Sequence, residues 1–313
     1  MQLIKEFNMK IEKVFVIGSG TMGNGIAHTF AQFGYKTTMM DISEDALKKA
    51  LSTIEKNLDR QVKKGSLSEE VKQATLANIT TANDYANIAE ADLVIEAATE
   101  NKELKFKIFQ EVDKLVKPEA ILATNTSTIS ITEIAAKTTR ANQFIGMHFM
   151  NPVPMMKLVE IIRGLATTDE TYNLINETAI QLGKIPVLAN DYPGFIANRI
   201  LMPFINEAIF ALMEGVGSVE GIDQVAKLGF AHPMGPLTLA DLIGLDTVLA
   251  ILEVLHNDIG DPPAPLASDG RLDHVPVLPD LPFKDLMDRP FIAFRAFQLE
   301  RVRYRHVLIP CSS

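Results

Sequence analysis

Two side chains near the middle of the sequence have the types needed for proton transfer. His148 lies near the end of the apolar segment 144–149, and Glu160 lies twelve positions later in the apolar segment 158–162. An imidazole, with an unperturbed pKa of about 6.5, can take a hydroxyl proton while hydride leaves the adjoining carbon. A carboxylate beside the ring would orient it. The prolines in 152–154 predict a chain reversal that pairs the two groups, although this spacing alone also fits a structural histidine and a surface glutamate.

A second chemical signature lies near the start of the chain. An apolar, β-branched segment at 14–17 is followed by the glycine pattern G-x-G-x-x-G and then by helical spacing over 21–33. The hexapeptide is Gly18-Ser19-Gly20-Thr21-Met22-Gly23. A first glycine permits a tight turn, a second lets backbone approach a pyrophosphate, and a third lets helix and strand pack closely. The free N–H groups of the following helix attract phosphate.

An acidic residue completes this signature. Asp41 ends a second predicted strand, 36–40, eighteen positions after Gly23. A carboxylate there accepts hydrogen bonds from the adenosine ribose of NAD and repels the 2′-phosphate of NADP. FAD shares the pattern, and a capping aspartate in a turn without a ligand is the other interpretation. The rest of the chain favours NAD.

The predicted elements form an α/β fold. Strand patterns at 14–17, 36–40, 79–81, 93–95, 120–123, 144–149 and 158–162 alternate with helical patterns at 21–33, 43–64 and 103–116. Such alternation predicts a Rossmann-type, mostly parallel sheet with its ligand at the carboxyl ends of the strands. Strand signals fade after Val187-Leu188. Helical patterns at 200–213, 219–228 and 237–255 predict a smaller all-α domain.

Three segments follow from these patterns. We expect an NAD-binding domain at residues 9–191, a helical C-terminal domain at 192–260, and an atypical tail at 261–313. The boundary at Asp191-Tyr192-Pro193-Gly194 is rich in turn formers. Residues 1–260 contain 19 Lys and 4 Arg, whereas 261–313 contain 1 Lys, 6 Arg and 8 of the 16 prolines.

Composition limits the possible partners and compartments. The formal net charge of −9 argues against nucleic-acid or anionic-membrane binding, which needs a basic face. The single cysteine, Cys311, fits a reducing compartment. With no signal-like N-terminus and no long apolar run, a cytoplasmic protein is expected, with Met9 as the native start. No cluster has metal-ligand spacing, so no metal is expected.

Four further motifs carry a resemblance to a known family. They are 124–127 (TNTS), 146–160 (GMHFMNPVPMMKLVE), 193–199 (PGFIANR) and 233–236 (PMGP). From about Met9 to Gly260 the chain resembles L-3-hydroxyacyl-CoA dehydrogenases, and most of all their bacterial short-chain, 3-hydroxybutyryl-CoA branch. The His-Phe-x-Asn-Pro block is the most specific of these motifs.

The resemblance implies a role for each matching residue. His148 matches the catalytic base, and Glu160 matches its orienting partner. Ser127 and Asn198 match residues that hydrogen-bond the substrate oxygen or the histidine. Residues matching positions near the nicotinamide are Glu100, Lys105 and Asn151; Lys64 matches a lysine that contacts CoA, while the nearby family serine is replaced by Asn57.

The implied activity is NAD-dependent oxidation of (3S)-3-hydroxyacyl-CoA, or the reverse, in fatty acid or butanoate metabolism. The resemblance also implies a homodimer that forms through the helical domain at 192–260, which would help to bind substrate. Two alternatives remain. A β-hydroxyacid dehydrogenase would act on a free acid with a lysine as proton donor, and an inactive relative would bind NAD without turnover. The tail lacks the family's ending, and its Lys-to-Arg change motivates the hypothesis of a replaced C-terminus, through a frameshift, a fusion or an artefact.

Overall fold

A single sheet organises the first part of the molecule. The computed structural model describes residues 10–259, and within them eight strands pair in the order β3-β2-β1-β4-β5-β6-β7-β8. All neighbours are parallel except β6 and β7. The strands are β1 (Lys13–Ile17), β2 (Lys36–Met40), β3 (Ile79–Ala82), β4 (Leu93–Glu96), β5 (Ile121–Thr124), β6 (Phe144–Phe149), β7 (Leu158–Arg163) and β8 (Ile185–Asn190).

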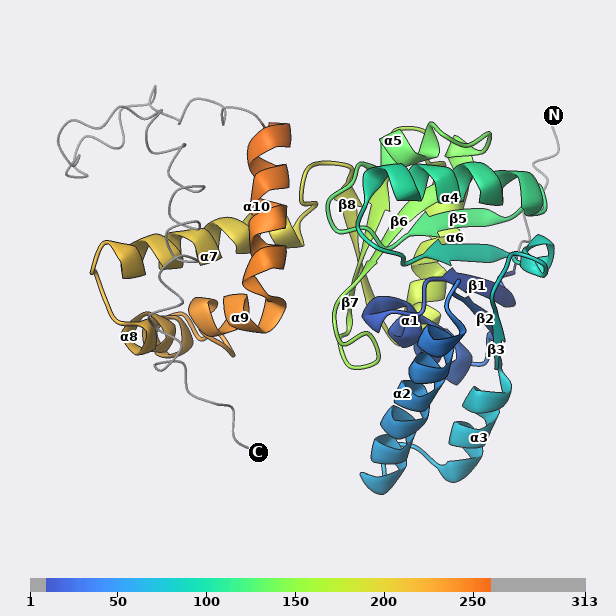
Figure 1. The fold of residues 1–313 in the computed structure, drawn as a ribbon, viewed down its shortest axis with the longest axis horizontal. Helices are drawn as coiled ribbons and strands as arrows, with labels where there is room; N and C mark the ends of the chain where they lie inside the picture. The colour runs from blue at the N-terminus through green and yellow to red at the C-terminus, as the bar shows by residue number, and fades with distance from the viewer. Residues whose placement is uncertain (1–9, 260–313) are drawn as a thin grey trace, which may run out of the picture. The chain divides into compact units, whose positions relative to one another are not determined.

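Helices cover both faces of this sheet (Figure 1). Alternate residues of β1 enter opposite cores, because successive side chains of a strand point to opposite faces. Val14 and Val16 belong to one core together with residues of α1 and α6, whereas Phe15 and Ile17 belong to the other core together with residues of α4 and α5. The helices of this part are α1 (Thr21–Gln32), α2 (Glu44–Lys63), α3 (Glu69–Ala77), α4 (Lys102–Leu115), α5 (Ile131–Ala135) and α6 (Asp169–Gln181), with short 3-10 turns η1 (Ile88–Glu90) and η2 (Ala141–Gln143).

The chain divides into two compact units after Phe195. The second unit is helical around its own core, in which Met202, Ile205, Ile209 and Val248 are buried. Its elements are α7 (Ala197–Met213), α8 (Val219–Gln224), the π-helical turn η3 (Val225–Gly229), α9 (Pro236–Ile243) and α10 (Leu245–Ile259). No helix of the described residues is long and apolar enough to cross a bilayer.

The predicted fold class is confirmed: a Rossmann-type domain precedes a helical one. The sequence patterns missed α3 and α6, which begin after the capping residues Ser68 and Thr168. The single helix predicted over 237–255 is wrong, because Gly244 adopts a φ of 97° and separates α9 from α10. The predictions for the start at Met9 and for the tail at 261–313 lie outside the described residues.

Candidate active site

The glycine turn between β1 and α1 has the close approaches that the pattern requires. Gly18 has a φ of +96°, and a Cβ on it would lie 2.6 Å from the carbonyl oxygen of Ala97. A Cβ on Gly23 would lie 1.8 Å from the carbonyl oxygen of Gly18. A Cβ on Gly20, in contrast, would meet no protein atom within 4 Å. The first and third glycines therefore serve packing, and the second borders open space.

The N-terminus of α1 is prepared for an anion. Its N-cap residue, Gly20, provides no side-chain hydrogen bond, and the first turn contains Thr21 and Met22 but no acidic residue. Helices α2 to α6 all begin with a Ser, Thr or Asn side chain that accepts a hydrogen bond from the first turn. The N–H groups at the start of α1 thus lack the side-chain acceptor that its neighbours have, which fits a bound pyrophosphate.

Asp41 connects the end of β2 to this turn. Its Oδ2 accepts hydrogen bonds from the backbone N–H (2.9 Å) and hydroxyl (2.8 Å) of Ser19, and its Oδ1 accepts one from the N–H of Ser43 (3.1 Å). Burial alone would raise the pKa of this carboxyl, but the hydrogen bonds from Ser19 and Ser43 outweigh it and lower the pKa. The ionised Asp41 lies where the ribose-binding acid of a dinucleotide site is expected.

His148 and Glu160 face each other in the antiparallel pair β6 and β7. The His148 Nδ1 and the Glu160 Oε2 are 2.7 Å apart, and both residues are buried. The ring of Phe195 packs edge-on against the imidazole at a centroid distance of 6.0 Å. Because Nδ1 is engaged by the carboxylate, Nε2 is the nitrogen that can exchange a proton with a substrate.

Asn125 fixes the position of the strand end that carries His148. Its Oδ1 accepts a hydrogen bond from the N–H of Phe149 (2.9 Å), and its own N–H donates to the carbonyl of Glu96 (2.8 Å). The ends of β4, β5 and β6 are therefore tied together. Asn125 lies in the 124–127 motif, yet the sequence alone indicated no role for it.

The turn containing Ser127 is held by a carboxylate. Glu100 accepts hydrogen bonds from the Ser127 N–H (2.9 Å), the Thr128 hydroxyl (3.2 Å) and the Thr126 hydroxyl. Burial would raise the pKa of Glu100, but the charge of Lys105 and these hydrogen bonds lower it. Glu100 thus positions the Ser127 turn at the carboxyl end of β5.

Lys105 belongs to the same network. Its Nζ lies 2.6 Å from Glu96 Oε1 and 3.3 Å from Glu100 Oε2, and its side chain is only 1% exposed. The Thr124 hydroxyl donates to the other Glu96 oxygen at 2.6 Å. The lysine expected near the nicotinamide therefore points into the protein. Glu96, which closes β4 within an otherwise apolar run, was not identified from the sequence.

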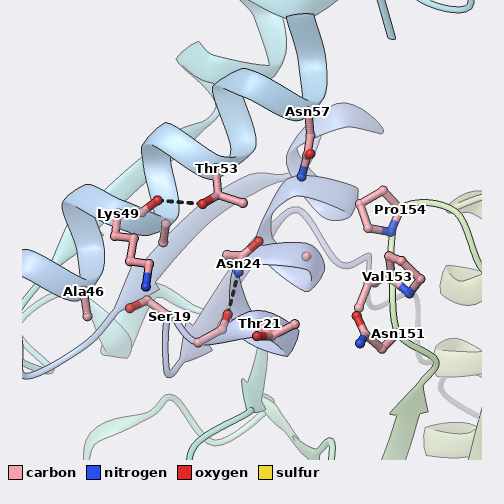
Figure 2. A pocket seen from close by; sticks show the side chains of 14 residues that line it. Ser19, Thr21, Asn24, Ala46, Lys49, Thr53, Asn57, Asn151, Val153 and Pro154 are labelled. Atoms are coloured by element: carbon pink, nitrogen blue, oxygen red, sulfur yellow. Dashed lines mark hydrogen bonds between the residues drawn. The ribbon is translucent and has the colours of Figure 1, made fainter. Parts of the chain in front are cut away.

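A pocket of about 420 Å³ opens beside the glycine turn (Figure 2). The turn and α1 form its floor, α2 forms one wall, and the 151–154 loop forms the other. The polar lining residues are Ser19, Thr21, Asn24, Lys49, Thr53, Asn57 and Asn151. The Lys49 amine points toward Ser19.

Two predicted contact residues lie apart from this pocket lining. Lys64 is exposed at the C-terminal end of α2, two turns beyond Asn57. Asn198 is buried in the first turn of α7, in the second compact unit. Their roles stay predictions. Among the residues described, no group of three or more His, Cys, Asp or Glu side chains is placed to hold a metal ion.

Known proteins share this arrangement. Residues 13–192 match the NAD-binding domain of 3-hydroxyacyl-CoA dehydrogenase, and residues 194–272 match its C-terminal domain. The second match continues past Gly260, where the motif resemblance ended. A 3-hydroxybutyryl-CoA dehydrogenase of Bradyrhizobium diazoefficiens is 54% identical over 251 residues, which are 80% of this chain and 86% of that protein.

Relatives with other origins agree. The mitochondrial hydroxyacyl-coenzyme A dehydrogenase of Homo sapiens is 42% identical over 79% of this chain and 80% of its own. The crystal structure of (S)-3-hydroxybutyryl-CoA dehydrogenase from Ralstonia eutropha superposes with a TM-score of 0.79 at 51% identity, covering 81% of this chain and 89% of that one. The chain therefore belongs to the 3-hydroxyacyl-CoA dehydrogenase family, and NAD is the cofactor of its first domain.

Proposed function

We propose that this protein oxidises (3S)-3-hydroxyacyl-CoA, with 3-hydroxybutyryl-CoA as its main substrate, to 3-ketoacyl-CoA, or catalyses the reverse reduction. One observation carries the proposal: the His148–Glu160 pair lies on the same sheet as the glycine turn and Asp41. A dinucleotide site and a buried proton-transfer pair together suit alcohol oxidation.

Each residue has a distinct part in this reaction. NAD, which the glycine turn and Asp41 would hold, would supply the acceptor for the hydride at the substrate's C3. His148 Nε2 takes the hydroxyl proton, while Glu160 holds Nδ1 and stabilises the imidazolium. Ser127 hydrogen-bonds the substrate oxygen, and the motif resemblance gives Asn198 a substrate-binding role. Glu100 and Asn125 act earlier, because their hydrogen bonds fix the Ser127 turn and the end of β6 before substrate arrives.

The CoA moiety has a candidate site beside α2. Its phosphates are anionic and its adenosine is polar, and both suit a pocket with a cation and several amide or hydroxyl groups. Lys49, Thr53 and Asn57 line that pocket from α2. Lys64, further along the same helix, adds a second cation. The amide of Asn57 can donate a hydrogen bond at the position where the family resemblance implies a serine hydroxyl.

A continuous assay of NADH oxidation tests the proposal. With acetoacetyl-CoA we expect turnover, and with free acetoacetate we expect none above background. Longer 3-ketoacyl-CoA substrates then give the chain-length preference. Equal rates with the free acid would point instead to a β-hydroxyacid dehydrogenase, and NADH binding without turnover would leave only a dinucleotide-binding protein.

We also propose that the protein forms a homodimer and is located in the cytoplasm. The second unit exposes apolar side chains, including Ile200 (67% exposed), Leu228 (83%) and Leu242 (70%), which suit burial against a second copy. Light scattering on a sizing column would give a dimer mass. A cytoplasmic location follows from the single cysteine and the substrate class, and fractionation of the source cell tests it.

A further inference from the structure

Two carboxylates and one ammonium meet at the carboxyl ends of the central strands. Lys105 forms ion pairs with both Glu96 and Glu100. The neighbouring cation, Lys102, is paired with Glu133 at 2.6 Å. Two negative charges against one positive charge leave this cluster with a net charge of −1.

The excess charge is not evenly exposed. Glu96 is fully buried, and its oxygens accept hydrogen bonds from Lys105, Thr124 and the N–H of Ala98. The Glu100 side chain, in contrast, is 38% exposed. Donors from the Ser127 turn keep Glu100 ionised without cancelling its charge. Glu100 is therefore the carboxylate through which the excess negative charge of the cluster reaches the surface at the carboxyl ends of the strands.

The topology places one half of the dinucleotide next to this cluster. The strand order reverses direction between β1 and β4, and ligands of open α/β sheets bind at that point. Asp41 at the end of β2 marks the adenosine side, and the glycine turn after β1 marks the pyrophosphate. The other half of the dinucleotide must then extend over the ends of β4 and β5, toward His148 on β6.

We propose that the Glu96–Lys105–Glu100 cluster makes the protein favour the oxidised cofactor. The nicotinamide ring of NAD+ carries a positive charge, whereas that of NADH is neutral, so a net negative charge nearby stabilises only the oxidised form. The rest of the cofactor has the same chemical structure in both forms. The inference rests on the NAD site proposed above. Tighter binding of NAD+ than of NADH would make the reduction potential of the bound NAD+/NADH couple lower than that of the free couple.

Equilibrium binding of NAD+ and NADH tests this, by calorimetry and by nicotinamide fluorescence. For Glu100→Gln we expect the ratio of Kd for NAD+ to Kd for NADH to rise about 3- to 10-fold, as removal of one charge at a partly solvated site implies. Glu100→Asp keeps the charge and should keep the ratio near the wild-type value. Glu119→Gln is the matched control. It removes an exposed charge just before β5, at the amino ends of the strands and so away from the cluster at their carboxyl ends.

The ratio separates charge from geometry. Disturbance of the Ser127 turn would weaken both cofactor forms alike and leave the ratio unchanged. Glu96→Gln removes a charge from the same cluster and should shift the ratio in the same direction, so the test survives if one variant fails to fold. An unchanged ratio in folded Glu100→Gln, or an equal shift in Glu119→Gln, overturns the proposal. Failure of the wild type to bind either form would instead refute the NAD site.

Discussion

His148 and Glu160 are direct partners across the β6–β7 ladder, with Nδ1 and Oε2 2.7 Å apart. In an antiparallel pair, opposite residues project to the same face, so the register itself brings acid and base together. The 151–157 loop between the strands is not needed to bring these two side chains together, and part of it lines the pocket beside α2. The proposed proton-transfer pair and part of the proposed CoA pocket thus belong to one hairpin.

Removal of the imidazole should abolish proton transfer but not cofactor binding. For His148→Ala we expect kcat with acetoacetyl-CoA and NADH to fall by about 10²- to 10⁴-fold, the usual contribution of a positioned acid or base. The Kd for NADH, measured by fluorescence, should stay within about twofold of the wild-type value, since Nε2 acts on substrate. A near-normal rate would remove His148 from the catalytic role.

Glu160→Gln tests the orienting role separately. The amide can still hydrogen-bond the ring but cannot stabilise the imidazolium by charge, so kcat should fall by about 10-fold or more while KM changes little. Steady-state kinetics across pH 6 to 9 is the measurement. A change confined to KM would mean that Glu160 acts on substrate binding instead.

The glycine turn allows a sharp comparison between two substitutions. Gly20→Ala should leave the melting temperature unchanged, because the new Cβ meets no protein atom within 4 Å. It should raise the Kd for NADH by about 10-fold or more, because the methyl occupies the approach of the pyrophosphate. Gly23→Ala should instead destabilise the fold, since its Cβ would lie 1.8 Å from the Gly18 oxygen. Thermal unfolding and fluorescence titration together distinguish the two outcomes.

Local patterns predicted much of the Rossmann part because its strands are continuous apolar runs. Segments such as 14–17 and 93–95 are buried on both faces, so they contain no polar interruption. Helix α3 was missed because only Thr75 is buried in it, and a helix with so little core contact has weak apolar periodicity. The apolar pattern over 237–255 predicts one helix that runs through Gly244, whereas the positive φ of this glycine ends α9.

The site was less predictable than the fold. The His148–Glu160 pairing needed only a hairpin register, which the sequence suggested. The role of Glu96 depends on a lysine nine positions later and a threonine on another strand, so no local pattern encodes it. The inward direction of Lys105 depends on the same three-dimensional arrangement.

The buried His28 makes stability depend on pH. It lies within α1 with no exposure, and neither ring nitrogen has a hydrogen-bond partner. Burial lowers the pKa of the imidazole to about 4, and the charge of Lys184 contributes to this shift. The nearby Gln32 amide opposes this shift, although it donates its hydrogen bond to Gln61 and not to the ring. In the unfolded state His28 therefore takes up a proton as the pH falls through about 6.5, whereas in the folded state it does so only near pH 4.

The consequence is a loss of stability on acidification. This linkage removes about 3 kcal/mol of unfolding free energy as pH falls from 7 to 4. In His28→Leu, which has an apolar side chain there, the unfolding free energy should change less between pH 7 and pH 4. This expectation holds whatever the substitution does to stability at pH 7. Urea unfolding of both proteins at several pH values is the measurement. Equal slopes would show that His28 does not titrate as the buried environment requires.

Lys184 should control the pocket through the 151–156 loop. Its buried ammonium donates hydrogen bonds to the carbonyls of Val153 and Met156, the latter at 2.8 Å. On the other side of the loop, Gly25 of α1 leaves so little room that a Cβ would lie 2.9 Å from that of Val153. The loop is thus held between a cation and a helix, and Val153 and Pro154 line the pocket from it.

Lys184→Met keeps most of the side-chain volume and removes both hydrogen bonds. We expect KM for acetoacetyl-CoA to rise about 10-fold, because a loosened loop loses substrate contacts, with a smaller fall in kcat. The Kd for NADH should change less than KM, since the glycine turn is untouched. Lys157→Met, an exposed lysine at the end of the same loop, is the matched control and should behave as wild type. A fall in kcat alone would indicate that the loop positions His148 instead of the CoA thioester.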